Sequence, residues 1–415
     1  MSSQGIAEPT IPTAAMNAHN GWIYFWSYVL IFFSGPLMYI GVLQAALCDR
    51  LGANATLANL PTAAFSLGQI APFIVSCVAP HRLERSLTVW AFGLLAASFA
   101  MVAVVLALPL PTTWKVALVV TQGLVQGITM STSDVFAMQC LGRGTTILGR
   151  SQTLKRTFTV TPIVGVAGSL GVQYTLHPGF HNLPFPYDFA IVFALGAVCL
   201  TGVSILSRRY WLIPLPDESR NGIVRFAWYA GRRYFTSRSL LLLWLIYFLW
   251  SCSRLVTPNI SLYSRHVLGR PTSDFSGLMM AFQFGGKAIG GAILGWLAVR
   301  WGQRWSIFAL LGFLIAGIVW AWTVPGYSYL FSFALVGATV LGGAYIPNFV
   351  MTLSGAEAGL TNLSILALAG PLSSFAPALH GVLADQFGFA ASFTLALMAG
   401  LLAFGLVAKI HENPK

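Results

Sequence analysis

Long apolar stretches fill nearly the whole of this chain, and short polar breaks separate them. A helix needs about 20 apolar residues to cross a hydrocarbon core of about 30 Å. Because lipid offers no hydrogen-bond partner, each span must satisfy its own backbone as a helix. Hydrophobic residues make up 56% of the chain and charged residues 8%, so little remains for a soluble domain. The sequence therefore predicts an all-α integral membrane protein.

About twelve of these stretches are long enough to span the membrane as helices. We predict transmembrane helices over residues 22–47, 57–79, 86–109, 114–139, 152–175, 188–207, 240–263, 274–299, 305–323, 327–352, 361–384 and 389–409.

The chain carries 23 Lys and Arg against 11 Asp and Glu, a net charge of +12. If both termini are cytoplasmic, most basic residues fall in inner loops, as the positive-inside rule requires. The outer loops then hold only Arg50, Lys115, Arg265 and Arg270. The basic balance therefore reflects topology and contact with anionic membrane lipid, not nucleic acid. The compact loops favour the bacterial cytoplasmic (inner) membrane.

The longest polar segment outside the tails divides the chain in the middle. It mixes arginines with aromatic residues, which suits a helix lying on the membrane surface. This division predicts a cytoplasmic tail at 1–21, an N-terminal six-helix bundle at 22–207, a basic cytoplasmic linker at 208–239, a C-terminal six-helix bundle at 240–409 and a cytoplasmic tail at 410–415.

The two halves echo each other. Gly35-Pro36 in the first span corresponds to Thr257-Pro258 in the seventh. Two further matches follow in the same order: the basic turns at 79–85 and 298–304, and the pairs Ser133-Asp134 and Pro347-Asn348. This order favours duplication. Paired six-helix halves with interrupted helices at matching places are typical of transporters, with the substrate site between the halves near the midplane.

Residues 295–304 read Gly-Trp-Leu-Ala-Val-Arg-Trp-Gly-Gln-Arg. This run resembles the cytoplasmic loop pattern of the major facilitator superfamily of secondary transporters, with Val299 where the family usually has Asp. Residues 80–85 and 381–388 are weaker copies. The resemblance implies twelve helices in two pseudo-symmetric six-helix halves and alternating access. It also implies coupling or gating roles for loop and helix-end residues, here Arg82, Arg85, Arg143, Arg300, Arg304 and Asp385.

Two cations lie near mid-depth in predicted spans, Arg254 in the seventh and Lys287 in the eighth. Charges inside a bilayer are costly, so each is a candidate functional residue. With no acid at that depth in the same half, they predict an anionic substrate group, which Arg binds bidentately and Lys as a point charge. The alternative is that they pair with carbonyls or with Asp134 and only hold the halves together.

Asp134 and His380 are the candidates for coupling or gating within the spans. Asp134 could accept a proton, or pair with Arg82, Arg85 or Arg143 at an inner gate. His380 could titrate near neutral pH, or be a buried histidine with satisfied hydrogen bonds. Further polar and aromatic residues could shape the cavity or instead bridge helices: Tyr39, Gln44, Gln69, Tyr247, Trp250, Asn259, Gln283 and Asn348.

No catalytic motif or nucleotide-binding loop appears in a suitable context, and the five cysteines have no metal-ligand spacing. We therefore expect no enzyme activity, cofactor or metal. The leading hypothesis is a monomeric secondary transporter of a small organic anion or zwitterion, with protons as a candidate coupling ion. The alternatives are efflux of amphipathic or aromatic compounds, a non-transporting receptor on the same fold, and a membrane enzyme, which would need an acid–base cluster.

Overall fold

The computed structural model describes residues 12–78, 83–177, 183–213 and 231–410, and this part of the chain is helical, without strands. Its first helices are α1 (Ala14–Phe33), α2 (Gly35–Met38), α3 (Leu43–Arg50), α4 (Ala55–Gly68), α5 (Ala71–Val78), α6 (Glu84–Ala107), α7 (Thr112–Gly144), α8 (Ile147–Leu176) and α9 (Tyr187–Ser207).

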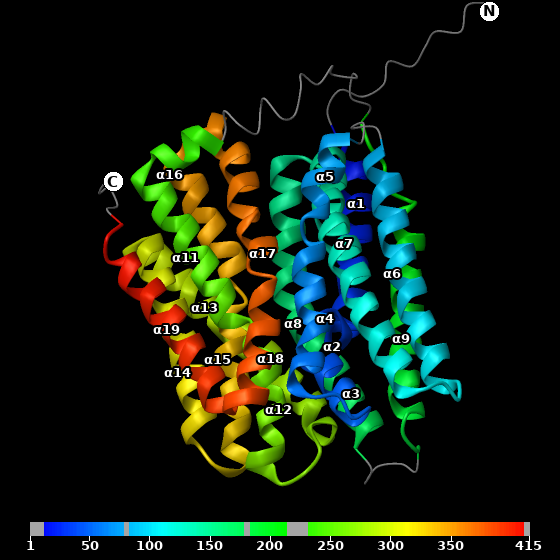
Figure 1. The fold of residues 1–415 in the computed structure, drawn as a ribbon. Coiled ribbons are helices and arrows are strands. Elements are labelled where there is room, and N and C mark those ends of the chain that lie inside the picture. Colours follow the sequence, from blue (N-terminus) through cyan, green and yellow to red (C-terminus); the bar gives the residue numbers. More distant parts are fainter. Residues whose placement is uncertain (1–11, 79–82, 178–182, 214–230, 411–415) are drawn as a thin grey trace, which may run out of the picture.

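The helices after the basic linker are α11 (Arg238–Arg254), α12 (Thr257–Leu268), η2 (Thr272–Phe275), α13 (Ser276–Trp301), α14 (Gln303–Thr323), η3 (Gly326–Leu330), α15 (Phe331–Thr339), α16 (Gly342–Ala367), α17 (Ala369–Leu372), α18 (Phe375–Phe387) and α19 (Phe389–Val407). Figure 1 shows α1 to α9 gathered on one side of the molecule and α11 to α19 on the other. α8 packs along α13 and α4 along α18, which joins the two groups.

Eight helical stretches among the described residues are long and apolar enough to cross a membrane. They coincide with eight of the predicted spans, the third, the sixth and all six in the second half of the chain. The other four predicted spans are helical too, over α1–α3, α4–α5, α7 and α8. The all-helical multi-pass architecture is thus confirmed, whereas the count of twelve and the pseudo-symmetry of two halves stay predictions.

One predicted break between helices is wrong. α16 continues to Ala367, whereas the sequence predicted a loop over residues 353–360. Polar side chains here bond within the helix: Ser354 Oγ donates to the Val350 carbonyl over 2.6 Å, and Asn362 Nδ2 donates to Ser354 Oγ over 2.8 Å. Eight residues cover about 12 Å along a straight helix, so the Asn362–Ser354 bond requires α16 to bend near the predicted break.

The interruption predicted at Gly35-Pro36 is present between α1 and α3. Pro36 lies in the first turn of α2, and the chain leaves helical geometry after Met38. Two glutamines satisfy carbonyls at the broken end. Gln44 Nε2 donates to the Leu37 carbonyl, and Gln126 Nε2 on α7 donates to the carbonyls of Leu37 and Met38, each over 3.0 Å. Irregular backbone at membrane depth is tolerated where the protein itself supplies such partners.

The matching interruption separates α11 from α12. Pro258 has no N–H to donate to the carbonyl of Arg254, four residues earlier. Thr257 Oγ1 takes that place and donates to the Arg254 carbonyl over 2.7 Å. As a result, Arg254 stands at the last position of α11, next to irregular backbone.

Close helix approaches depend on glycine. A Cβ at Gly127 of α7 would overlap the Phe65 carbonyl of α4, and a Cβ at Gly286 of α13 would overlap the Ala334 carbonyl of α15. In lipid, where apolar burial gives little drive to associate, such close packing holds helices together.

The two ends of the molecule differ. The basic end, at the top of Figure 1, comprises the start of α1, the α7–α8 connection and the start of α11; the far end comprises the last turns of α3 and α12. Several contacts between the two helix groups lie at the far end. Arg265 forms an ion pair with Asp49 at 3.7 Å, and Arg50 donates to Ser273 Oγ over 3.1 Å. The far end is therefore closed in this conformation.

Candidate functional site

Tyr39 and Lys287 meet where the two helix groups face each other. Tyr39 follows α2 in non-helical geometry, which turns its ring toward α13. Lys287 Nζ donates a hydrogen bond to Tyr39 Oη. The ammonium also lies 4.8 Å from the Tyr39 ring centre and 5.1 Å from that of Phe32, distances typical of cation–π contacts.

Arg254 lies beside this pair without a polar partner of its own. Its guanidinium carbon is 5.1 Å from the Trp250 ring centre, and Tyr39 and Tyr247 are its electrostatic neighbours. Among the described residues it makes no hydrogen bond or ion pair, and its Nε atom is buried. The indole N–H of Trp250 is likewise buried and unpaired. We call Arg254, Lys287, Tyr39, Tyr247 and Trp250 the cationic site.

The cationic site therefore brings together five of the predicted substrate-binding residues from α2, α11 and α13. Sequence reasoning missed the aromatic side chains that surround it. Phe284 contacts Tyr39 edge-on, with ring centres 4.9 Å apart, and Phe32 at 5.8 Å. Phenylalanine is abundant in this chain, so only the i, i+3 spacing of Phe284 and Lys287 along α13 could have singled it out.

Asp134 lies on α7 near the cationic site. Its side chain is exposed, and Tyr28 Oη donates to its Oδ1 over 3.5 Å. Lys287 is its electrostatic neighbour. The predicted pairing of Asp134 with Arg143 is not formed, because nine residues place the two about 180° apart around α7 at 3.6 residues per turn. Arg143 instead forms an ion pair with Glu84.

The other predicted gating arginines lie apart from the cationic site. Arg85 donates to the Tyr210 carbonyl over 3.2 Å, rather than to Asp134, and Arg304 donates to the Ala408 carbonyl over 2.9 Å. Arg300 is exposed. Arg82 lies outside the described residues. These contacts hold helix ends at the basic end, each within one helix group.

The remaining predicted amides divide by environment. Gln44 donates a hydrogen bond to the Leu37 carbonyl near the end of α2, as described above. Gln283 on α13 is buried, and its Oε1 atom has no partner among the described residues. Gln69 and Asn348 are exposed, on α4's C-cap and on α16. None of the four contacts Arg254 or Lys287 through a recorded hydrogen bond.

His380 and Asn259 belong to a second, buried cluster. His380 Nε2 lies 3.1 Å from the Cys252 carbonyl, which can only accept, so Nε2 carries the proton. Nδ1 lies 3.1 Å from Ser392 Oγ and accepts from it. Asn259 Nδ2 donates to the His380 carbonyl and to Ser392 Oγ, each over 2.8 Å, and Asn59 Nδ2 donates to Asn259 Oδ1 over 2.6 Å. In this conformation both ring nitrogens of His380 are hydrogen-bonded.

Asp385 joins the two helix groups near the far end. Its carboxylate accepts from the backbone N–H groups of Ala55 and Thr56, over 2.9 and 2.8 Å, and from Thr56 Oγ1 over 2.5 Å. These donors form the first turn of α4, whose free N–H groups favour a negative charge. Asp385 therefore ties α18 to the start of α4.

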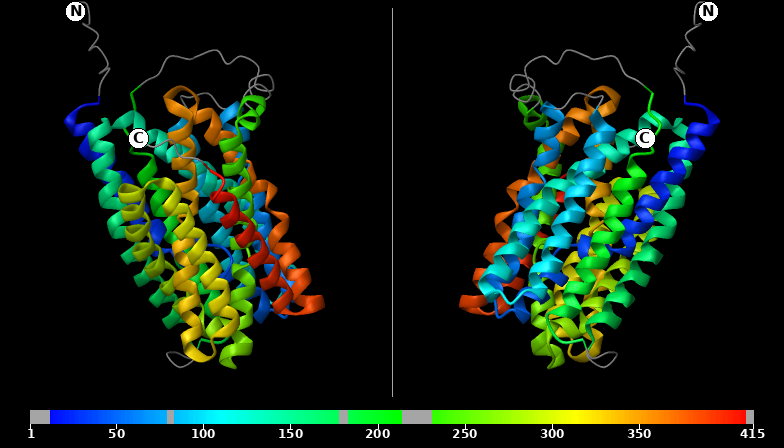
Figure 2. Two further views of the ribbon diagram at one scale, coloured as in Figure 1. Left: turned by 90° about the vertical axis from the view of Figure 1, so that its left-hand side faces the viewer. Right: turned by 90° about the vertical axis from the view of Figure 1, so that its right-hand side faces the viewer.

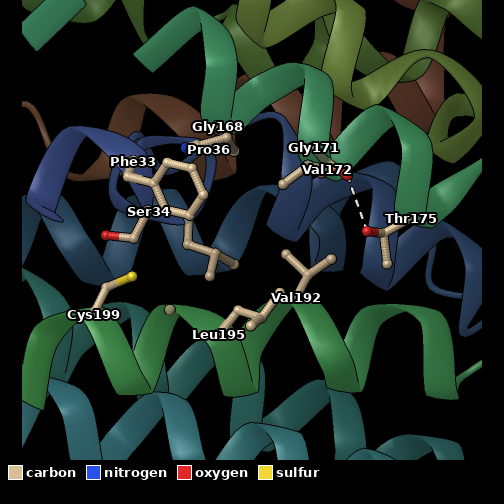
Figure 3. A pocket seen from close by; sticks show the side chains of 12 residues that line it. Phe33, Ser34, Pro36, Gly168, Gly171, Val172, Thr175, Val192, Leu195 and Cys199 are labelled. Atoms are coloured by element: carbon tan, nitrogen blue, oxygen red, sulfur yellow. Dashed lines mark hydrogen bonds between the residues drawn. The ribbon is translucent and has the colours of Figure 1, made fainter. Parts of the chain in front are cut away.

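A cavity of about 190 Å³ is bordered by the α1–α2 break, α8 and α9. Figure 3 shows the side chains that line it. Its lining is mainly apolar, with Phe33, Val172 and Leu195 around it, and the Thr175 hydroxyl is already bonded to the Gly171 carbonyl over 2.9 Å. No charged side chain lines it, and Arg254 and Lys287 lie elsewhere. It does not suit an anion.

Solved transporter structures resemble the chain over nearly its full length. A substituted form of the nucleoside transporter NupG superposes with a TM-score of 0.69 at 12% identity, over 95% of this chain and 100% of that one. A bacterial homologue of the human lysosomal transporter Spinster gives 0.62 at 12%, over 95% of each chain. A bacterial homologue of the human drug peptide transporters PepT1 and PepT2 gives 0.63 at 13%, over 95% and 97%.

No family model matches this sequence, and neither does any curated protein. At identities of 12–13% the structural likeness shows the fold alone. The likeness in fold nevertheless extends over 95% of the chain. This protein has the fold of the major facilitator superfamily transporters.

Proposed function

We propose that this protein is a secondary transporter of a small organic anion or zwitterion. Its two pseudo-symmetric six-helix halves alternate access to a solute bound at the cationic site. Arg254 holds the anionic group, Lys287 adds a second positive charge, and the rings of Trp250 and Tyr247 contact the body of the solute.

The observation that carries the proposal is the state of Arg254. A positive charge within a membrane span normally pairs with an acid or with carbonyls, because leaving it unpaired is costly. Arg254 has no such partner among the described residues, and its Nε atom is buried. A carboxylate or phosphate of the solute would supply the missing acceptors, two at once in the bidentate geometry that Arg favours.

The closed far end supports the alternating-access part of the proposal. With Asp49–Arg265 and Asp385 holding that end, the cationic site would connect to the basic end in this conformation. If the basic end is cytoplasmic, this state is inward-facing. The Spinster homologue was likewise solved in an inward-facing and unoccupied conformation.

Uptake and counterflow in proteoliposomes test the function. Anionic metabolites would be screened with and without a proton gradient, for wild type and for Arg254→Ala and Lys287→Ala. Loss of anion flux in both variants, with folding intact, supports the proposal, and the gradient dependence identifies coupling. Flux of a neutral or cationic compound that survives both substitutions contradicts it.

A second candidate is efflux of amphipathic aromatic compounds. It is favoured by the ring contacts of the cations, since Arg254 lies over Trp250 and Lys287 over Tyr39 and Phe32. In this case the cations only pack against the rings, and Arg254→Ala would leave transport intact. A receptor on the same fold would bind its ligand without counterflow.

A further inference from the structure

A second cavity, of 650 Å³, lies between the first turns of α1 and α8, at the basic end. Figure 2 shows the start of α1, in blue, at the edge of the molecule in both views. Trp22 and Leu148, which line the cavity, are exposed to 50% and 69%. The cavity therefore opens sideways, between exposed apolar side chains.

The lining is positively charged and contains no acid. Arg156 is exposed and makes no ion pair with any described residue; its guanidinium carbon lies 4.3 Å from the ring centre of Phe25. Gln152 adds amide donors beside it. The start of α8, a helix of 30 residues, contributes the positive end of its dipole to the same place.

We propose that this cavity binds the headgroup of an anionic phospholipid. The phosphate would lie against Arg156, and the acyl chains would run along exposed apolar residues such as Trp22 and Leu148. Charge complementarity selects an anion, and the opening between exposed apolar side chains favours a lipid over a soluble anion. Anionic lipids are enriched at the cytoplasmic surface, and basic residues near it attract them. A tryptophan at the cavity rim matches the headgroup level that this side chain prefers.

Lipid binding by the purified full-length protein tests this site independently of transport. Native mass spectrometry would compare phosphatidylglycerol with phosphatidylcholine at equal concentration. We expect wild type to retain phosphatidylglycerol preferentially, and Arg156→Gln to weaken that binding about fivefold, which corresponds to about 1 kcal/mol for one basic residue. Gln152→Glu places an acid in the cavity and should weaken it as well.

Lys155→Gln is the matched control, because Lys155 is exposed on the same turn of α8 but does not line the cavity. It should leave phosphatidylglycerol binding unchanged. Equal losses in Lys155→Gln and Arg156→Gln would show diffuse surface attraction and overturn the site. So would equal retention of both lipids by wild type, or displacement of the lipid by inorganic phosphate, which would identify a soluble-anion site.

Discussion

The ammonium of Lys287 donates to the phenol oxygen of Tyr39, and so joins α13 of one helix group to the broken segment after α2 of the other. Tyr39 is also an electrostatic neighbour of Arg254. The phenol thus bonds to one cation and lies within electrostatic range of the other, although the two are 33 positions apart in the chain. The first prediction concerns this phenol.

Tyr39→Phe removes the acceptor but keeps the ring. A hydrogen bond to a charged group contributes about 1.5–3 kcal/mol, so we expect KM for the transported anion to rise about tenfold. The maximal rate should change less, because the ring contacts remain. Tyr345→Phe is the control, since its phenol donates to the Gly291 carbonyl away from the cations. An unchanged or lower KM in Tyr39→Phe would show that the phenol competes with the solute.

Arg254→Met should separate stability from transport. It removes a charge whose buried Nε has no partner and retains an apolar side chain of similar length. We expect thermal unfolding in detergent to shift upward, by about 1–3 kcal/mol in free energy, the scale of one unsatisfied buried polar group. Anion counterflow should be lost. A lower unfolding temperature would instead show that Arg254 stabilises the contact between the helix groups.

Asp134→Asn tests coupling against gating. The amide can still accept from Tyr28 but carries no charge and cannot bind a proton. Because Asp134 faces Tyr28 and Lys287 rather than Arg143, we expect proton-driven accumulation to be lost while counterflow persists. Arg143→Gln, which breaks the ion pair with Glu84, is the comparison for a gate. If Asp134→Asn abolished counterflow as well, the carboxylate would be needed for the conformational change itself.

Asp385→Asn should loosen the far end. The amide carries no charge, so the attraction between the carboxylate and the N-terminus of α4 is lost. That attraction contributes about 1 kcal/mol, which corresponds to about a fivefold change in the ratio of closed to open far ends. Ser273 is fully buried there. A cysteine at this position, in a chain without native cysteines, should react faster with a membrane-impermeant maleimide after Asp385→Asn. Thr56→Val removes one of the three donors and should have a smaller effect; an equal effect would exclude the charge as the cause.

The two mid-depth cations could be identified from the sequence as candidate site residues, because a charged residue within an apolar span is rare. It could not show that Tyr39 bonds to Lys287, since that depends on the break after α2 and on Gln126 satisfying the carbonyls there. Interruptions at Pro36 and Pro258 could be predicted because proline lacks a backbone N–H, although Pro61, Pro162 and Pro347 stand inside continuous helices.

The ends of helices were harder to predict from the sequence than their interiors. α16 continues to Ala367 through a polar stretch where hydropathy alone predicts a break. Likewise, Asp134 and Arg143 both looked like gate residues in sequence. Only the helical period places them on opposite faces of α7.

α7 is a single uninterrupted helix from Thr112 to Gly144, and it touches the site and the basic end at once. Gln126 donates hydrogen bonds to the two carbonyls that precede Tyr39, and Arg143 forms an ion pair with Glu84 on α6. Because both contacts lie on one continuous helix, a movement of α7 at one of them also displaces the other. Tilting it to part Arg143 from Glu84 must also shift Tyr39, and with it the ammonium of Lys287. Under the proposed function, the position of α7 within its own helix group therefore affects how the cationic site holds the solute.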